Sequence, residues 1–470
     1  MTRLPLRLAL PPLALFVLLA APRPLAAQTT ASTPLGPTQG LVRDATVTAV
    51  LHDISPSRLR ATDSALVSFG TRNTLSDTLS STRGIGAARR WLHAQMEAIS
   101  KDCGGCLRVE YDPAMVEVMR DPARPTVNVV NVLGWLPGRD TTHVIVIGGH
   151  YDSCVCSLPG GGYDTTTTAP GADDDGSGSS AVLELARTFA KRYPHGLNAT
   201  IVFAIYAGEE QGLLGSTHLA KRLKDGGYTV LAGMTDDIAG DVQAEDGTVD
   251  STHVRIFAAD PDNSPSRELG RYVWALGHLY LHGFTVNPIW RIDRIQRGGD
   301  HMPYVESGWA GLRFSEPLEN YNHQHLPTDQ FQFVNFGYLA NVARANAMTV
   351  ASIAAAPITP QDARAVREAH GASGGQAWAL SWQPSPGAVK YEVLIRRTIS
   401  PQYERVVDVG NVTNYVLHTQ LDDEWAGVRA VDANGHRSMT APLPSPPPLR
   451  SFNRAPEPGR GARGGSGPTP

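Results

Sequence analysis

The sequence predicts an α/β protein, in which a β-sheet carries helices on both faces, followed by a smaller all-β sandwich. Two short apolar runs, residues 144–149 and 200–207, are typical of strands buried on both sides, and segments with helical periodicity follow them. Such alternation of strands and helices is typical of α/β sheets. From residue 377 onward, only short strand-like runs separated by turn signals occur, which favours a sandwich.

The amino terminus has the features of a secretory signal peptide. Arg3 and Arg7 precede an apolar stretch over residues 8–21, and small residues follow up to Ala27. The apolar stretch is too short for a permanent membrane helix. We therefore expect a signal peptide over 1–27 and a secreted or periplasmic protein without stable membrane insertion after cleavage. Residues 28–40, which are small and polar, are interpreted as a linker.

The first globular domain is predicted over residues 41–356. Its expected helices cover residues 85–99, 181–190, 215–223 and 336–355, and its expected strands cover 107–111, 127–133, 144–149, 200–207 and 254–258. The sandwich is predicted over 358–448, with strands at 378–382, 391–396, 415–417 and 427–431. The segment 449–470 is rich in Pro, Gly and Arg and is expected to be disordered.

The composition restricts the class of partner. The chain has 470 residues, 41% of them hydrophobic, which is enough for a sizeable core. The formal net charge is only −4, and no basic cluster is present, so a nucleic-acid partner is not expected. The oligomeric state is left open.

The four cysteines are Cys103, Cys106, Cys154 and Cys156. An even number in an exported chain predicts disulfides, and three pairings are possible. We favour two bridges that join the segment of Cys103 and Cys106 to the segment of Cys154 and Cys156. Such bridges would brace the loop after His150. The alternatives are four free thiols or a structural zinc site.

Five motifs contain side chains of the types that bind metal ions in proteins. They are Gly-Gly-His-Tyr-Asp-Ser at 148–153, Pro-Gly-Ala-Asp-Asp-Asp-Gly-Ser-Gly at 170–178, Ala-Gly-Glu-Glu-Gln-Gly at 207–212, Asp-Asp-Ile-Ala-Gly at 236–240 and His-Gln-His-Leu-Pro-Thr-Asp at 323–329. Imidazole and carboxylate together suit zinc. Two of the motifs follow buried strands directly, and ligands of α/β sheets bind beyond the carboxyl ends of the strands.

The five motifs, in this order, resemble those of the secreted bacterial two-zinc aminopeptidases, whose clan includes glutamate carboxypeptidases and glutaminyl cyclases. The resemblance covers roughly residues 57–355 and implies the zinc-exopeptidase fold, with a mixed sheet. It implies two Zn²⁺ ions held by His150, Asp174, Glu210, Asp237 and His325, with Asp174 bridging both. It also implies Glu209 as general base. Asp152 can accept the free ring N–H of His150 and fix its tautomer.

Several neighbouring residues compete for these roles. Asp236 competes with Asp237 and His323 with His325, and in both pairs the family pattern favours the second residue. Asp173 and Asp175 are interpreted as turn and helix-cap residues. Asp300 and His301 are expected near the site but not as ligands. The oxyanion donor is left open between Tyr321 and Arg297.

We therefore expect an exported di-zinc metallo-exopeptidase that acts on peptide or protein substrates, and within that class an aminopeptidase. The alternatives are a carboxypeptidase or dipeptidase of the same clan, a glutaminyl cyclase, or a binding protein without catalysis. The order of Trp382, Tyr391 and the Ala-Gly-Val-Arg-Ala-Val run at 426–431 resembles a fibronectin type III domain. No candidate ligand lies beyond His325.

Overall fold

The computed structural model describes residues 31–368 and 377–443, so the expected signal peptide and the tail at 449–470 lie outside the described residues. The larger part of the fold is an eight-stranded sheet in the order β2-β3-β5-β4-β6-β9-β7-β8. The neighbouring pairs β5/β4, β4/β6, β6/β9 and β7/β8 are parallel, whereas the pairs β2/β3, β3/β5 and β7/β9 are antiparallel. The predicted mixed α/β sheet is thus confirmed.

The strands of this sheet are β2 (Arg108–Glu117), β3 (Thr126–Leu136), β4 (Asp140–His150), β5 (Ala199–Tyr206), β6 (Thr229–Asp236), β7 (His253–Ala258), β8 (Thr285–Ile289) and β9 (Gly311–Ser315). The helices are α1 (Ala45–Asp53), α2 (Pro56–Ser68), α3 (Gly84–Asp102), α4 (Gly178–Arg192), α5 (Leu214–Asp225), α6 (Pro265–Tyr280), α7 (Met302–Glu306) and α8 (Phe336–Ala355), with short turns η1 (Gly161–Tyr163) and η2 (Ala172–Ser177). Strands β6, β8 and β9 and helices α6 and α7 were not predicted from the sequence.

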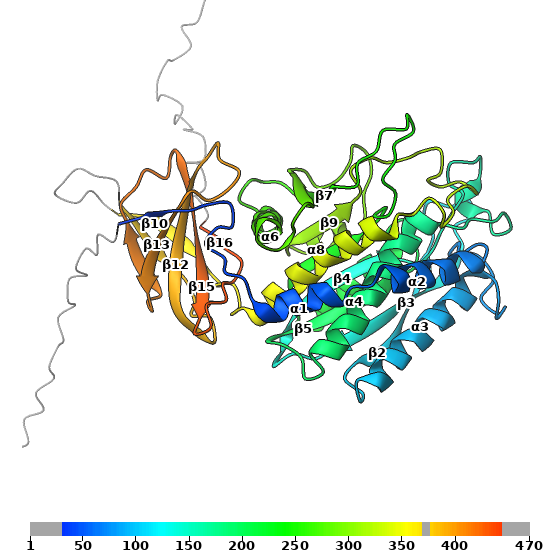
Figure 1. Cartoon of the computed structure of the whole chain (residues 1–470), viewed down its shortest axis with the longest axis horizontal. Coiled ribbons are helices and arrows are strands. Elements are labelled where there is room, and N and C mark those ends of the chain that lie inside the picture. The colour runs from blue at the N-terminus through cyan, green and yellow to red at the C-terminus, as the bar shows by residue number, and fades with distance from the viewer. Residues whose placement is uncertain (1–30, 369–376, 444–470) are drawn as a thin grey trace, which may run out of the picture.

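Helices cover both faces of the sheet because its central strands are apolar on both sides. On β4, Ile145 and Ile147 belong to the core that includes α3, α4 and α8, which cross the near face in Figure 1. Val144 and Val146 point the other way and pack with α5 and with Tyr304 of α7. The continuous apolar run that predicted this strand reflects burial on both faces.

The second part is a sandwich of two sheets with its own core. One sheet has the order β1 (Thr33–Pro34), β13 (Arg405–Gly410), β12 (Ala388–Arg397), β15 (Glu424–Asp432) and β16 (Ala441–Pro442), and the other consists of β10 (Arg364–Arg367), β11 (Trp378–Ser381) and β14 (Asn414–Leu417). Its core includes Trp378, Tyr391 and Val428. The segment 28–40, interpreted as a linker, contributes the edge strand β1 through pairing of Thr33 with Val406.

The sandwich docks on the first domain beside α6 (Figure 1). Asp262, which lies just before α6, binds Arg271 of that helix at 2.6 Å and Arg396 of β12 at 2.8 Å. The hydroxyl of Tyr272 donates to the backbone oxygen of Arg437. His436 lies 2.8 Å from Asp44, the residue that caps α1. Ion pairs and hydrogen bonds therefore join the two parts at several points.

The disulfides are local, with Cys103 bonded to Cys106 and Cys154 to Cys156. The prediction that the bridges join the two segments was wrong. Helix α4 begins beside the acidic motif and runs 15 residues, about 22 Å, away from it. The Cys106 sulfur lies 3.9 Å from the backbone oxygen of Ala190, near the far end of α4. A disulfide needs Cα atoms within about 7 Å, so these positions favour local pairs.

Within the described residues, no helix combines the length and the apolar character needed to cross a membrane.

Candidate metal centre

The candidate ligands gather where three neighbouring strands end. In the sheet, β5 and β6 flank β4 and run parallel to it, so all three carboxyl ends face the same side. His150 is the last residue of β4, Glu209 and Glu210 follow β5, and Asp237 follows β6. Asp174 lies in η2 before α4, and His325 lies in the loop between β9 and α8. The sheet therefore brings together five segments far apart in the sequence.

These side chains form two clusters with one shared member. His150, Asp174 and Asp237 place one potential ligand atom each within 4.8 Å of one another, and so do Asp174, Glu210 and His325. In the first cluster, Nε2 of His150 lies 3.2 Å from Oδ1 of Asp174 and 3.8 Å from Oδ1 of Asp237. In the second, Nε2 of His325 lies 2.9 Å from Oδ2 of Asp174 and 3.4 Å from Oε2 of Glu210.

Asp174 thus turns a different oxygen towards each cluster. Its Oδ1 faces His150, and its Oδ2 faces His325. A carboxylate with this orientation can bridge two cations a few Å apart. The geometry agrees with the bridging role that the sequence predicts for it.

The acidic loop around Asp174 is held by hydrogen bonds to two buried side chains. The carboxylate oxygens of Asp329 accept the backbone N–H groups of Asp173 at 2.9 Å and Asp174 at 3.0 Å. On the other side, the guanidinium of the fully buried Arg72 donates to backbone oxygens of residues 66, 151, 170 and 171. Hydrogen bonds from within the protein therefore hold the backbone around Asp174 in place.

Asp152 braces the turn after β5. Its two oxygens accept the backbone N–H groups of Glu209 and Glu210, each at 3.2 Å. Its backbone oxygen lies 3.1 Å from Nδ1 of His150, while its carboxylate is at 3.6 Å. The sequence predicts Asp152 as the acceptor for the ring N–H of His150. In the structure the nearer acceptor is the main-chain carbonyl of Asp152, and the carboxylate accepts the two backbone N–H groups instead.

Glu209 stands apart from both clusters and faces the cavity beside them, a space of about 390 Å³. Among the described residues, its carboxylate makes no direct hydrogen bond in the structure. Burial, with nearby carboxylates, raises the pKa of Glu209 to about 7. A carboxylate with a pKa near neutrality is suited to accept and return a proton. Adjacent Glu210 belongs to the second cluster, whereas Glu209 belongs to neither.

The competing residues lie elsewhere. Asp236 accepts a hydrogen bond from Asn346 at 2.5 Å inside the core, and the ring of His323 stacks on Phe333 at 3.8 Å. Asp175 accepts the backbone N–H groups of Gly178 and His150, as a turn and cap residue does. Asp173 instead accepts N–H groups of the loop at residues 240–241.

Asp300 and His301 are both buried, and neither belongs to one of the two clusters of candidate ligands. Of the two oxyanion candidates, Arg297 lines the cavity. Tyr321 is half exposed and donates its hydroxyl to Glu319, and it is not part of the cavity wall.

Three supporting residues escaped the analysis of the sequence. Arg313 is fully buried in β9 and lies 3.0 Å from Oδ1 of Asp237. Gln324 donates to Oδ2 of Asp174 at 3.1 Å. Arg72 holds the acidic loop, as described above. The sequence carries a signal for Arg313 alone, since a lone arginine in the short apolar run at 311–314 is unusual unless it is paired.

The residues present fit divalent metal ions. The buried Nε2 of His150 and Oε1 of Glu210 have no hydrogen-bond partner among the described residues. Burial lowers the pKa of both histidines, yet the surrounding carboxylates raise that of His150 well above its usual value and that of His325 to about 10. Cations bound between these groups would offset the excess of buried negative charge. The mixture of imidazole and carboxylate suits zinc.

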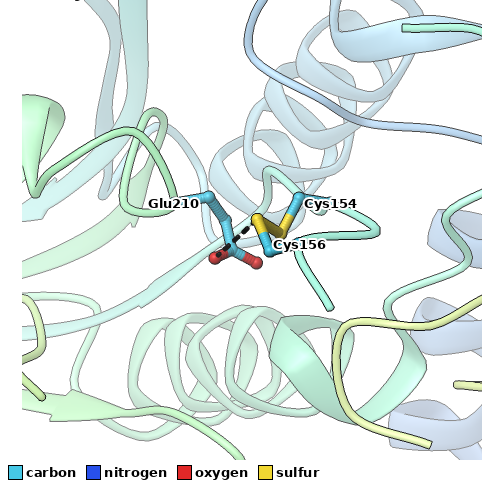
Figure 2. A group of neighbouring side chains, drawn as sticks. All are labelled: Cys154, Cys156 and Glu210. Carbon is cyan, nitrogen blue, oxygen red and sulfur yellow. Dashed lines mark hydrogen bonds between the residues drawn. A yellow bond between two sulfur atoms is a disulfide. The ribbon is translucent and has the colours of Figure 1, made fainter. Parts of the chain in front are cut away.

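The Cys154–Cys156 disulfide packs against the second cluster (Figure 2). The Cys156 sulfur lies 4.0 Å from Oε2 of Glu210. Because both cysteines are oxidised, neither offers a thiolate to a metal ion. The local bridge therefore closes the loop after His150 beside a candidate ligand.

Known proteins resemble this chain along most of its length. The model of "Peptidase family M28" matches residues 131–350. A probable zinc metalloprotease of Pyrenophora tritici-repentis is 36% identical over 432 residues, which cover 84% of this chain and 96% of that relative. A probable zinc metalloprotease of Leptosphaeria maculans is 36% identical over 430 residues, covering 85% and 97%.

Two solved structures from Legionella pneumophila share the fold. They are the LapA aminopeptidase (TM-score 0.52, 23% identity, 67% of this chain and 74% of that one) and LapB (TM-score 0.53, 22% identity, 69% and 78%). With the sequence matches and the paired clusters of histidine and carboxylate, the conclusion follows that the chain belongs to peptidase family M28 and is a zinc-dependent peptidase.

Proposed function

We propose that the protein is an exported aminopeptidase that works with two zinc ions and removes amino-terminal residues from peptides. The shared carboxylate of Asp174 carries this proposal, because its two oxygens face two separate groups of ligands. His150 and Asp237 would hold one ion, Glu210 and His325 the other, and Asp174 both. Bound zinc supplies Lewis acidity and lowers the pKa of a water molecule.

The side chains of the site divide the remaining work. Glu209 takes a proton from the attacking water and returns it to the departing amine, for which its pKa of about 7, raised by burial, is suited. Asp152 holds the main chain of Glu209 and Glu210 in place. Arg313 forms an ion pair with Asp237 and offsets its negative charge. The cavity of about 390 Å³ has room for the end of a peptide.

Two rival functions have less support. A glutaminyl cyclase uses one zinc, whereas both clusters here have a full set of three donors. A binding protein without catalysis does not require a carboxylate that is free to accept a proton, and Glu209 is such a group. A carboxypeptidase or dipeptidase would use the same metal ligands and differs only in which substrate end is bound.

Export rests on the signal-like segment at residues 1–27, and the two local disulfides agree with an oxidising compartment. For the sandwich we propose a fibronectin type III-like domain. Its sheets of three and five strands, the fifth being the short β1 from the amino terminus, support that relationship.

The test combines zinc content with a substrate panel. Purified protein should hold two zinc ions per chain, lose activity on chelation and regain it with zinc. It should cleave aminoacyl anilides and peptides with a free amino terminus but spare amino-blocked peptides. Cleavage of blocked peptides from the carboxyl end would instead identify a carboxypeptidase. One zinc per fully active chain would refute the two-ion proposal.

A further inference from the structure

The cavity beside the metal clusters contains three guanidinium groups in addition to its carboxylates. Arg120, Arg294 and Arg297 line it together with Glu209, Glu210 and other site residues. Arg120 comes from the loop between β2 and β3, and the other two come from the loop between β8 and α7. The carboxylates of the cavity are the candidate metal ligands and the proposed base. The three arginines are neither candidate metal ligands nor the proposed base.

Arg294 is already paired within the protein. Its guanidinium lies 3.0 Å from Asp293 and 2.8 Å from Glu319. Glu319 also accepts from Arg255 at 2.8 Å and from the hydroxyl of Tyr321 at 3.1 Å. The carboxylate of Glu319 therefore already accepts three hydrogen bonds.

Arg297 forms a long ion pair with Glu319. The nitrogen and oxygen atoms are 3.9 Å apart, which is too far for a hydrogen bond. Its side chain is only 29% exposed, so water solvates the charge incompletely. The guanidinium thus keeps its donors free on the wall of the cavity.

Arg120 is an exposed residue that lines the same cavity and lies over the turn that carries the base. A Cβ built on Gly212 would lie 3.3 Å from Nε and 3.6 Å from Cζ of Arg120, so its side chain rests on the turn after Glu209 and Glu210. The hydroxyl of Tyr163 donates to its backbone oxygen and anchors the residue. No ion pair or hydrogen bond of its guanidinium occurs within the described part of the chain.

Two guanidinium groups that donate no hydrogen bond to a carboxylate of the described residues line one cavity, and such groups are suited to bind an anion. The planar fork of arginine matches a carboxylate with two parallel hydrogen bonds. A peptide offers this group either as an acidic side chain or as the α-carboxylate of a short peptide. The geometry points to a carboxylate of the substrate, bound by Arg297 and Arg120, as a determinant of specificity. This inference rests on the proposed peptidase function and adds the substrate class, namely acidic or very short peptides.

The test compares substrates that differ only in one carboxylate, using the zinc-loaded full chain. Alanyl-leucine against alanyl-leucinamide reports on the α-carboxylate, and alanyl-glutamyl amide against alanyl-glutaminyl amide reports on the side chain. We expect kcat/KM to favour the carboxylate in at least one pair by tenfold or more. Arg297→Gln should remove this preference by raising KM for the carboxylate-bearing substrate roughly tenfold to hundredfold, clearly more than for its neutral counterpart. Arg120→Gln should have the same effect to a smaller degree.

The matched control is Arg124→Gln, in the same loop as Arg120. Its side chain is 57% exposed and does not line the cavity, so both preferences should persist. Equal rates within both pairs for the native enzyme would overturn the inference. So would an equal kcat loss on neutral and charged substrates in Arg297→Gln, because that result would place Arg297 at the reacting carbonyl.

A separate binding measurement distinguishes failure of this inference from failure of the proposed function. If no peptide is cleaved, the proposed function fails, and calorimetry with the same four peptides decides the inference. Carboxylate-dependent binding that is lost in Arg297→Gln would support it, and binding that is indifferent to the carboxylate or to the substitution would refute it.

Discussion

Replacing Asp329 with Asn tests how far the acidic loop depends on one buried carboxylate. The two oxygens of Asp329 accept the N–H groups of Asp173 and Asp174, at 2.9 and 3.0 Å. Asparagine keeps one oxygen, but its NH₂ group would face a second N–H donor. The substitution preserves size and removes one hydrogen bond to a charged acceptor.

The magnitude follows from that single bond. A hydrogen bond to a charged group contributes about 1.5–3 kcal/mol. Because the bond holds Asp174, the shared member of both clusters, the loop would relax in the metal-free variant and would have to be reordered when zinc binds. Since about 1.4 kcal/mol corresponds to tenfold in affinity, we expect zinc to bind roughly 10- to 100-fold more weakly.

The assay is competition for zinc with a chelator at pH 8, combined with thermal unfolding of the metal-free protein. Burial raises the pKa of Asp329 to about 7, so its carboxylate is charged at that pH. The control is Asp140→Asn, since Asp140 similarly accepts two backbone N–H groups, of Thr142 and His143, but lies at the opposite end of β4 from His150. Zinc affinity of Asp329→Asn within threefold of the native value, with unchanged stability, would refute the reasoning.

Three further substitutions or truncations probe the site and the domains. Glu209→Gln should keep normal zinc content and lower kcat by about 10² or more, so near-native turnover would remove Glu209 from the mechanism. Asp174→Asn should lose at least one zinc ion and nearly all activity, whereas Asp173→Asn, outside both clusters, should retain both ions; the reverse order would show that the bridging residue is assigned wrongly. A chain ended after residue 357 keeps all seven site residues and should still bind zinc. It exposes the buried Glu268 and Arg271 of α6, which contact the sandwich, so we expect it to unfold at a lower temperature. Unchanged thermal stability would show that docking contributes little.

The elements that could be predicted are those whose burial pattern is local. Strand β4 and strand β5 are apolar on both faces, and α8 shows its stripe of apolar residues over all of 336–355. Strand β9 could not be predicted in the same way, because Arg313 and Ser315 interrupt a run of five residues. Only the nearby carboxylates of Asp237 and Asp293 make a buried arginine tolerable there.

The candidate ligands were also predictable as a set, because metal chemistry restricts them to a few residue types at the ends of strands. The roles of the residues around them were not. Asp152 braces backbone N–H groups, and Arg72, Arg313 and Gln324 support the loop and the ligands across long sequence distances. Their partners are backbone atoms or side chains that no local pattern associates with them.

Periodicity and residue type are local properties, and they are enough to predict the class of fold, the strand ends that carry ligands and the chemistry of those ligands. The pairing of the cysteines, the addition of residues 33–34 to the sandwich and the different positions of Asp236 and Asp237 became known from the folded structure. Each of these features depends on distances between atoms in segments that are far apart in the chain. The course of α4 along the sheet separates the two cysteine segments, and the packing of the sandwich on α6 determines which segments lie near its edge.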